Sequence, residues 1–312
     1  MSTTLISICI PAYKRHDYLK RLLESIQIQS FTNYEVIITD DSPDESVQSL
    51  CLQYKDLLPL KYFKNSQPLG TPENWNEAVR QASGQWIKIM HDDDWFSDSK
   101  SLAAFAAATR QTDKSFIFSG YFNVPENTGK KEQVEISLLR WNALKKNPVS
   151  LLSKNVIGPP SVTLYRSQQG IQYDKQMKWL VDMDFYIRFL KIAEPYYIEQ
   201  PLVSIGIHPS QVTAGSKLKP EVEIPEHLLL LEKTGEHAFR NILFYDAYWR
   251  LFRNLGIRKT DDLQRFAGNR PLSRVIVSMI RFQDQIASSL LKKGLFSKLF
   301  MSVSFLRNYF KS

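Results

Sequence analysis

The feature that most restricts which folds this 312-residue chain can adopt is an apolar stretch that runs directly into three consecutive aspartates. Residues 86–90, Trp-Ile-Lys-Ile-Met, have the pattern of a short buried strand, and Asp92, Asp93 and Asp94 follow after His91. Adjacent carboxylates repel one another unless positive charge lies among them. Magnesium and manganese bind such oxygen ligands and keep positions open for phosphates. The stretch therefore indicates either a seat for a divalent metal with a nucleotide diphosphate, or a solvated acidic turn.

The first part of the chain alternates strands and helices. An apolar run at Leu5–Ile10 predicts a strand, Tyr18–Gln29 has helical periodicity, and Glu35–Thr39 predicts a second strand that ends in Asp40 and Asp41. A strand, a helix and a strand in succession indicate parallel pairing with a right-handed crossover. Ligands in such sheets bind outside the carboxyl ends of the strands. A second acidic strand end in one sheet therefore strengthens the prediction of a ligand site.

The pattern continues to about residue 207. Thr71 is expected to cap a helix with Pro72 at its first position, and a polar stretch at 125–135 is expected to form a loop. The other expected elements are helices near 44–54, 99–110 and 182–192, and strands at 60–64, 115–119, 162–166 and 196–207. These elements predict an α/β fold.

Composition and cysteine usage limit the class of protein. Hydrophobic residues make up 43% of the chain, which is typical of a folded globular protein and excludes a disordered one. Cys9 and Cys51 have no metal-ligand spacing, and two isolated thiols favour a reducing compartment. The N-terminus lacks the regions of a signal peptide, and no window reaches the roughly 18 continuous apolar residues of a spanning helix. We therefore expect a cytoplasmic protein.

Positive charge is concentrated at the C-terminal end of the chain. From Arg250 to Ser312 there are thirteen Lys and Arg against three Asp, which gives this part a net charge of +10. The whole chain has a net charge of +8, so the residues before Arg250 sum to about −2. Residues 272–293 and 295–310 place basic residues opposite an apolar face. Such helices either cap the body of the protein or lie on an anionic membrane surface at the inner face of the cell membrane. No motif supports binding to nucleic acid.

Together these pieces resemble the inverting glycosyltransferase family two, which has the GT-A fold. The resemblance covers residues 5 to about 215 and depends on several motifs in order: Ile6–Arg15, Glu35–Ser42, Asn76 with Gly84, Asp92–Asp94, Asp182 with Asp184 and Arg188, and His208. It implies a mixed, mainly parallel sheet flanked by helices in residues 1–220, and a basic amphipathic helical region in residues 221–312.

The resemblance also implies a nucleotide-sugar site and a metal site. The nucleotide-diphosphate sugar would contact Pro11, Ala12, Tyr13, Arg15, Asp41, Asp92 and Asp93, with Asp40 as the alternative to Asp41. Manganese or magnesium would be held by Asp93, Asp94 and His208, although three aspartates in a row leave the register of the Asp-X-Asp motif open. His91 is interpreted as structural.

For catalysis the resemblance implies that Asp182 is the base that takes the proton of the acceptor hydroxyl. Inversion is a single in-line displacement, so one carboxylate and one metal suffice. The family usually has Glu before this Asp, whereas this chain has Val181, and a helix N-cap is the alternative role for Asp182. Gly158, Pro159 and Asp184 would lie on the acceptor side, and an ion pair with Arg188 is the alternative for Asp184.

The sequence therefore predicts a metal-dependent inverting glycosyltransferase, hexosyltransferase-like, that moves a sugar to a saccharide or lipid-linked acceptor in cell-surface polysaccharide biosynthesis. A metal-dependent nucleotidyltransferase is an alternative, but it needs a Gly-rich phosphate loop where this chain has Pro-Ala-Tyr-Lys-Arg. A non-catalytic nucleotide-sugar-binding or scaffold protein is another. A dinucleotide-dependent oxidoreductase is disfavoured because no Gly-X-Gly-X-X-Gly follows a strand.

Overall fold

The computed structural model describes residues 5–167, 170–209 and 218–309. The chain divides into two compact units. The first unit comprises Met1–Lys145, Val156–Lys175 and Asp184–Gln211, and the second comprises Lys146–Asn155, Gln176–Met183 and Val212–Ser312. The last segment of the second unit begins near the predicted boundary at residue 220, and two short earlier segments join it.

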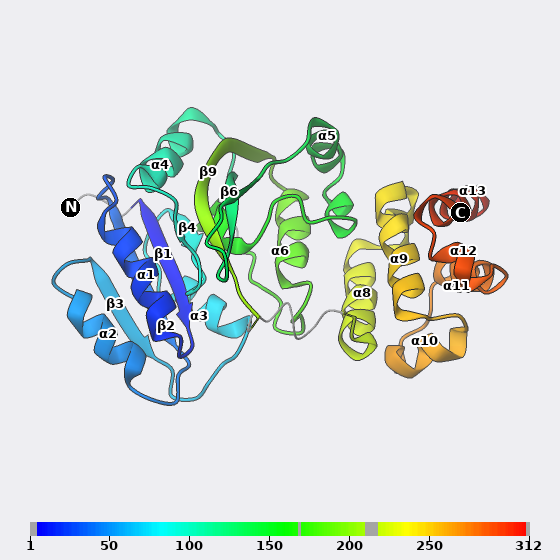
Figure 1. Ribbon diagram of the computed structural model, residues 1–312, viewed down its shortest axis with the longest axis horizontal. Helices are drawn as coiled ribbons and strands as arrows, with labels where there is room; N and C mark the ends of the chain where they lie inside the picture. The colour runs from blue at the N-terminus through cyan, green and yellow to red at the C-terminus, as the bar shows by residue number, and fades with distance from the viewer. Residues whose placement is uncertain (1–4, 168–169, 210–217, 310–312) are drawn as a thin grey trace. The chain divides into compact units, whose positions relative to one another are not determined.

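The first unit is built on one mixed sheet of nine strands (Figure 1). The strand order is β3-β2-β1-β4-β8-β6-β9-β5, and β7 pairs with β6. The strands are β1 (Ile6–Ala12), β2 (Tyr34–Asp40), β3 (Leu60–Lys64), β4 (Trp86–Ile89), β5 (Trp95–Phe96), β6 (Phe116–Pro125), β7 (Glu132–Val134), β8 (Thr163–Arg166) and β9 (Pro195–Ile207). The predicted strand-helix-strand order thus forms the parallel part of the sheet, β3-β2-β1-β4.

The register of the parallel strands brings their carboxyl ends to one edge. Ala12 in β1 is opposite Asp40 in β2, and Cys9 is opposite Ile89 at the end of β4. The residues after β1, β2 and β4 therefore leave the sheet at the same edge. This is the edge at which α/β sheets bind ligands.

Helices flank the sheet, and several of them bury an apolar face. The helices of this part of the chain are α1 (His16–Gln27), α2 (Ser46–Tyr54), α3 (Glu73–Arg80), α4 (Ser101–Gln111), α5 (Leu138–Lys146) and α6 (Val181–Leu190). In α1 the fully buried side chains are Leu19, Leu22, Leu23 and Ile26, which recur at helical spacing. Strands β1 and β2 are buried along almost their whole length, so the core lies on both faces of the sheet.

Two local expectations from the sequence were wrong. Pro72, not Thr71, precedes α3, which begins at Glu73, and no side chain caps this helix start. The stretch 125–135 contains β7, which pairs with β6 around the turn at residues 126–131. Polar composition hid this strand because its side chains are mostly exposed.

The second unit is helical. Its helices after residue 217 are α8 (Pro220–Thr234), α9 (Ile242–Leu255), α10 (Thr260–Ala267), α11 (Arg274–Asp284), α12 (Ser288–Leu291) and α13 (Gly294–Tyr309), with short 3-10 turns at Glu236–Arg240 and, earlier, Pro148–Leu152. The side chain of Asn241 caps α9 by accepting from the amides of Leu243 and Phe244, and Gly256 ends it in the left-handed conformation.

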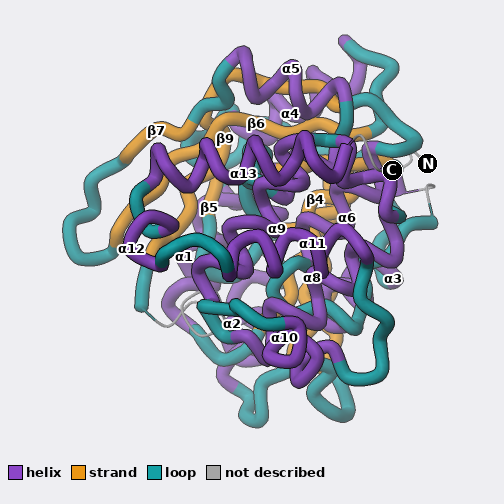
Figure 2. Tube along the Cα trace, turned by 90° about the vertical axis from the view of Figure 1, so that its right-hand side faces the viewer, coloured by secondary structure: helices purple, strands orange, loops and turns teal. Residues whose placement is uncertain are grey.

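Helix α9 forms the core of this helical unit. Tyr245, Tyr248 and Trp249 on it are almost completely buried. The indole of Trp249 donates to Ser297 Oγ on α13 at 3.0 Å, and Gln283 on α11 donates to the carbonyl of Trp249 at 2.9 Å. Helices α9, α11 and α13 therefore pack together, as the tube in Figure 2 also shows.

Within the part of the chain that the structure describes, no helix combines the length and the apolarity that crossing a bilayer requires.

Candidate active site

The three carboxylates that follow β4 are buried. Asp92, Asp93 and Asp94 expose only 7%, 7% and 2% of their surfaces. Every residue of β4 is buried as well, and the strand pairs with β1 and β8, so the sheet fixes the start of this turn. The carboxylates therefore do not form a solvated acidic turn. Burial of adjacent carboxylates costs free energy unless cations or hydrogen-bond donors satisfy them.

Basic side chains from distant segments lie against this turn. Arg15 Nη1 is 3.0 Å from Asp93 Oδ2 and 3.4 Å from Asp92 Oδ1. His208, directly after β9, places Nε2 at 2.8 Å from the same Asp93 oxygen. Arg21 on α1 donates to the backbone carbonyl of Asp93 at 2.7 Å. The ends of β1 and β9 and helix α1 thus all converge on Asp93.

Asp94 is held by a different set of groups. The amide of Gly206 in β9 donates to Asp94 Oδ1 at 3.2 Å, and the Ser161 side chain also forms a hydrogen bond with this carboxylate. His91 Nδ1 lies 4.0 Å from Asp94 Oδ2. Burial, followed by repulsion from Asp93, raises the pKa of Asp94 well above its usual range. Additional positive charge at this position would therefore favour the ionised carboxylate.

His91, Asp93 and Asp94 form a group that could hold a metal ion. Each offers one ligand atom, and these atoms lie within 4.8 Å of one another. His91 Nε2 is buried without a hydrogen-bond partner among the described residues, and the ring packs against Trp75 with 4.7 Å between centroids. Burial and then repulsion from Asp93 raise the pKa of Asp92 to about 7, so this turn is short of positive charge. Carboxylate oxygens suit magnesium and manganese, and a neutral imidazole nitrogen can add a further ligand, so the residues fit a divalent cation.

Both histidines considered in the sequence lie near the buried aspartates. His208, expected as the third ligand, places Nε2 2.8 Å from Asp93 Oδ2, whereas the candidate metal group among the described residues consists of His91, Asp93 and Asp94. His91, interpreted as structural, belongs to that group. Its position immediately before the aspartates could have indicated this, because a turn of four residues brings the first side chain back toward the last.

The end of β1 supplies an exposed aromatic ring beside the carboxylates. The amide of Tyr13 forms a hydrogen bond with the Asp92 carboxylate, and half of the Tyr13 surface (50%) is exposed. Lys14 and Arg15 have positive φ angles of 62° and 33°, and the Lys14 amide donates to Ser42 Oγ at 2.7 Å. This backbone bend turns Arg15 toward Asp93. The Tyr13 ring is accessible for stacking.

Pro11 and Ala12 form the last two positions of β1. Ala12 is 1% exposed, and its carbonyl accepts from the amide of Asp41 at 3.0 Å. The backbone of these residues therefore joins the ends of β1 and β2. They define one side of the sheet edge that carries the candidate site.

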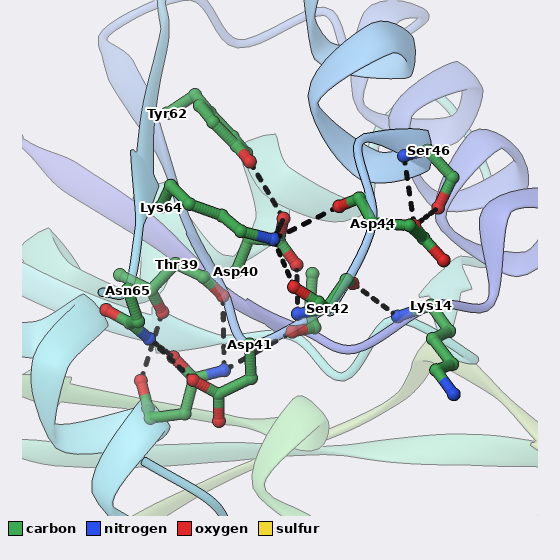
Figure 3. A network of polar contacts seen from close by, with 12 residues as sticks. Lys14, Thr39, Asp40, Asp41, Ser42, Asp44, Ser46, Tyr62, Lys64 and Asn65 are labelled. Carbon is green, nitrogen blue, oxygen red and sulfur yellow. Dashed lines mark hydrogen bonds and ion pairs between the residues drawn. The ribbon is translucent and has the colours of Figure 1, made fainter. Parts of the chain in front are cut away.

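The end of β2 carries a network of polar contacts (Figure 3). Asp40 Oδ2 accepts from Tyr62 Oη at 2.8 Å and from Lys64 Nζ at 3.0 Å, and Oδ1 accepts from the amide of Ser42 at 2.7 Å. Lys64 also donates to the carbonyls of Ser42 and Asp44. Asp40 is completely buried, and a buried carboxylate needs partners. Tyr62 and Lys64 on the neighbouring strand β3 supply them.

Asp41 has different partners. Its Oδ1 accepts from Asn65 Nδ2 at 2.7 Å and from the amide of Leu69 at 3.0 Å, and Oδ2 accepts from the amide of Gly70 at 2.8 Å. Asp41 therefore fixes the loop between β3 and α3 against the end of β2. Of the two aspartates, it is the one whose partners belong to a loop rather than to the adjacent strand.

Lys88 is a buried lysine that the sequence interpretation did not use. It lies in β4, has 0% exposure and packs over the ring of Phe105 with 4.6 Å to the centroid. Burial lowers its pKa well below the usual range, although Asp94 opposes this. Its Nζ donates to the carbonyl of Ser161, whose hydroxyl accepts from the amide of His91 at 2.9 Å. Lys88 thus holds Ser161, the residue that positions His91. A single Lys within an apolar strand was the sequence signal that could have indicated this buried residue.

The residues expected on the acceptor side have structural partners. Gly158 has φ 106°, and a Cβ there would lie 2.7 Å from Tyr121 Cε1, so only glycine fits. Asp184 is fully buried and accepts from Arg188 Nε at 2.9 Å and Nη2 at 2.6 Å, which is the ion pair left open as the alternative. Pro159 precedes the short 3-10 turn at Pro160–Val162.

Asp182 lies in the first turn of α6. Its Oδ1 accepts from the amide of Met183 and its Oδ2 from Asn155 Nδ2, each at 2.8 Å. The side chain is partly accessible to solvent, yet the surrounding protein excludes enough water that burial raises the pKa of Asp182 to about 6, against the effect of these hydrogen bonds. A carboxylate with this pKa is ionised at neutral pH and retains basicity.

Known proteins resemble the chain in sequence. The family model described as glycosyl transferase family 2 matches residues 7–168, just over half of the chain. An uncharacterized glycosyltransferase of Rickettsia typhi is 24% identical over 225 residues, which cover 67% of this chain and 66% of the relative, slightly less than two thirds of its length. The putative colanic acid biosynthesis glycosyl transferase WcaA of Escherichia coli is 25% identical over 222 residues, which cover 68% of this chain and 77% of the relative.

Solved structures share the fold. The structure of residues 1–349 of Staphylococcus aureus TarS in complex with UDP-GlcNAc has a TM-score of 0.66 at 18% identity and covers 98% of this chain and 89% of that chain. The mannosyltransferase PcManGT from Pyrobaculum calidifontis, in complex with GDP-Man and Mn2+, has a TM-score of 0.56 at 14% identity and covers 98% of this chain and 86% of that chain. The predicted GT-A fold is confirmed.

The chain therefore belongs to glycosyl transferase family 2. The predicted family and the general class, a glycosyltransferase with relatives in polysaccharide biosynthesis, are confirmed.

Proposed function

We propose that the protein is a metal-dependent inverting glycosyltransferase. It would move a sugar from a nucleotide-diphosphate sugar to a saccharide or lipid-linked acceptor in the synthesis of cell-surface polysaccharide. The observation that carries this proposal is the group of His91, Asp93 and Asp94, whose ligand atoms lie within 4.8 Å of one another beyond the end of β4. Buried carboxylates with raised pKa values at this sheet edge are suited to a cation that also binds phosphate oxygens.

A divalent cation, manganese or magnesium, held by His91, Asp93 and Asp94 would supply Lewis-acid stabilisation of the departing diphosphate. In this proposal a hydrogen bond from His208 orients the carboxylate of Asp93, since Nε2 lies 2.8 Å from Oδ2. Arg15, which contacts Asp93, would supply a second positive charge to the phosphate oxygens.

The nucleotide would occupy the ends of β1 and β2. The exposed ring of Tyr13 is available to stack on the base, and Asp92, which lies beside Tyr13 and Arg15, would contact the ribose. Pro11, Ala12 and Asp41 would line the base side, with Asp41 also fixing the loop that follows β3. The solved neighbour TarS binds UDP-GlcNAc and PcManGT binds GDP-Man, which supports a nucleotide sugar as the donor class.

Asp182 is proposed as the base. It would accept the proton of an acceptor hydroxyl while that oxygen forms a bond to the anomeric carbon and the bond from this carbon to the diphosphate breaks. The pKa of about 6, raised by burial, suits proton uptake near neutral pH. Gly158 and Pro159 would border the acceptor, and Asp184 would support this side through its pair with Arg188.

The helical unit is proposed to bring the enzyme to the inner face of the cell membrane. Helix α13 exposes Leu295, Leu299 and Leu306 by 82%, 58% and 51%. These positions recur at helical spacing, and the exposed Lys292 and Lys298 lie near them in the sequence. An apolar stripe flanked by basic residues is suited to the surface of an anionic bilayer.

A thermal-shift screen tests the donor site. The full chain is mixed with UDP, GDP, TDP or CDP, each with and without Mn2+, because a ligand that binds the native state raises the apparent stability. One nucleotide should raise the midpoint only in the presence of metal. A shift without metal would contradict metal dependence. No shift with any nucleotide would favour a non-catalytic protein.

A further inference from the structure

The helical unit contains a cavity lined by arginines that the donor and acceptor sites do not use. This arginine pocket lies between α11 and α13, which pack side by side (Figure 2), and has a volume of about 430 Å³. Its polar lining consists of Arg274, Arg281, Arg307, Ser278, Gln285 and Asn308 with Ser304. No carboxylate contributes to the lining among the described residues, so the pocket has a formal charge of +3.

The arginines of this pocket form no ion pair among the described residues, and the acid that lines the adjoining cavity with Arg274 is Glu236. No described carboxylate pairs with Arg274 or Arg281, which are seven residues apart and therefore lie on the same face of α11. The nearest acid along that helix, Asp284, instead lies 3.8 Å from the guanidinium of Arg258. Arg307 is positioned over the ring of Phe282, with 4.7 Å to the centroid. Planar guanidinium groups with free donors suit phosphate oxygens.

A second cavity adjoins the arginine pocket and has an aromatic lining. This aromatic pocket has a volume of about 720 Å³ and shares Arg274, Ser278 and Asn308 with the arginine pocket. Its apolar lining is Phe239, Tyr245, Val275, Phe305 and Tyr309. Its polar lining also includes Glu236, His237 and Arg240. Together the two pockets offer an anion site directly beside an aromatic wall, and each falls within the usual volume range of small-molecule pockets.

We propose that the two pockets bind one phosphate-headed lipid, with its phosphate or diphosphate in the arginine pocket and the start of its hydrocarbon chain in the aromatic pocket. Charge complementarity selects the head, because three arginines face the cavity without a carboxylate. The adjoining aromatic wall selects a lipid over a free phosphate, since apolar surface gains from burial only when the ligand has an apolar part. This binding does not depend on the proposed sugar transfer.

Isothermal titration of the full chain with three probes tests the proposal. The probes are farnesyl diphosphate, inorganic diphosphate and farnesol, which carry both parts, the head alone and the chain alone. Farnesyl diphosphate should bind at least about 10-fold more tightly than either of the others, because each part of the ligand gains from its own pocket. Equal affinity for inorganic diphosphate would overturn the proposal and make the cavity a free-phosphate site.

Paired variants test the location. The double variant Arg274→Gln, Arg281→Gln should weaken farnesyl diphosphate at least about 10-fold, since charged hydrogen bonds are lost. The control double variant Lys259→Gln, Arg265→Gln removes the same charge from exposed residues that line neither pocket, and should change affinity less than about 2-fold. Equal loss in both would indicate diffuse surface charge and overturn the proposal.

A third variant preserves the charge and removes the space. Ser278 lines both pockets, so Ser278→Trp should fill their shared wall and abolish binding of farnesyl diphosphate. Unchanged affinity in this variant would also overturn the proposal. The response to nucleotide and Mn2+ should stay the same in all these variants, so a failure of the lipid site is distinguishable from a failure of the donor site.

Discussion

The imidazole of His208 lies 2.8 Å from the carboxylate of Asp93, although 115 residues separate them in the chain. The contact joins the end of β9 to the turn after β4. His91 is the histidine of the candidate metal group, with Asp93 and Asp94. In the proposed function these two histidines have different roles: His91 offers a ligand atom, and His208 orients a carboxylate.

The first prediction distinguishes these two histidines. His91→Ala removes a ligand atom, whereas His208→Ala removes a neighbour of Asp93, so both should weaken the binding of Mn2+. His91→Ala should weaken it by at least about 100-fold and His208→Ala by about 10-fold, the smaller effect typical of groups that orient a ligand. The affinity is measured by the electron paramagnetic resonance of free Mn2+. The reverse order would assign the ligand role to His208.

The second prediction concerns the close approach of β9 to the Asp93 backbone. A Cβ at Gly206 would lie 2.6 Å from the carbonyl oxygen of Asp93 and 3.2 Å from Arg21 Nη2, so Gly206→Ala must displace the metal-binding turn. We expect a loss of about 1 to 3 kcal/mol in the free energy of unfolding and weaker Mn2+ binding. Urea denaturation and the Mn2+ titration measure the two effects.

The matched control is Gly294→Ala, where a Cβ would meet no atom within 4 Å and the φ angle is not positive. Its free energy of unfolding should stay within about 0.5 kcal/mol of the wild type or rise. If Gly206→Ala behaved in the same way, the contact with Asp93 would not restrict this position.

The third prediction follows from the raised pKa of Asp182. Between its usual value of 3.8 and about 6, the folded protein holds a proton that the unfolded chain has released. The free energy of unfolding therefore falls as the pH rises through this window, and the loss persists at higher pH. Asp182→Asn has no such charge and should be more stable than the wild type at pH 7.5 by roughly 1 to 2 kcal/mol.

The same variant should lose sugar transfer while its nucleotide affinity stays nearly unchanged, because a base acts in the transition state. The stability difference should shrink toward zero at pH 4, where the folded wild type is also protonated at this position. Urea denaturation at the two pH values measures it. A variant that is less stable than the wild type at pH 7.5 would show that burial does not strain the carboxylate.

The parallel part of the sheet could be predicted from the sequence because its evidence is local. Apolar runs such as Leu5–Ile10 and Glu35–Thr39 are bounded by turn residues and separated by one amphipathic helix, and the rules for crossovers then fix their pairing. The positions of the carboxylates at one sheet edge followed from that pairing. Strand β7 was missed because it is short, polar and mostly exposed, so it carries no alternating pattern.

Side-chain partnerships could not be predicted in the same way. Whether His91 or His208 faces a carboxylate depends on where β9 meets the turn after β4, and pairing between β9 and its neighbours joins residues about 80 to 110 positions apart. The hydrogen bonds from the amides of Leu69 and Gly70 to Asp41 depend on the path of the loop after β3. Such contacts are set by tertiary packing, for which one sequence offers no local signal.

The last prediction concerns Glu226, whose carboxylate binds the backbone amides just before α6. Glu226 on α8 is 5% exposed and accepts from the amides of Lys178 at 2.8 Å, Trp179 at 2.9 Å and Leu180 at 2.8 Å. These amides come directly before α6, whose first turn carries Asp182. The contact therefore fixes the start of the helix that presents the proposed base, and a negative charge there also favours the helix dipole.

Glu226→Gln keeps the size of this side chain but turns one acceptor oxygen into a donor that faces backbone N–H groups. We expect a loss of about 2 kcal/mol in the free energy of unfolding, because buried donors lose their acceptor. The turnover number should fall with little change in donor affinity, since the start of α6 becomes less ordered while the carboxylates after β4 stay intact. Glu232→Gln on the same helix, an exposed residue paired with Arg270, is the control. Equal effects of the two variants, or a loss of donor affinity in Glu226→Gln, would contradict a role for Glu226 in positioning Asp182.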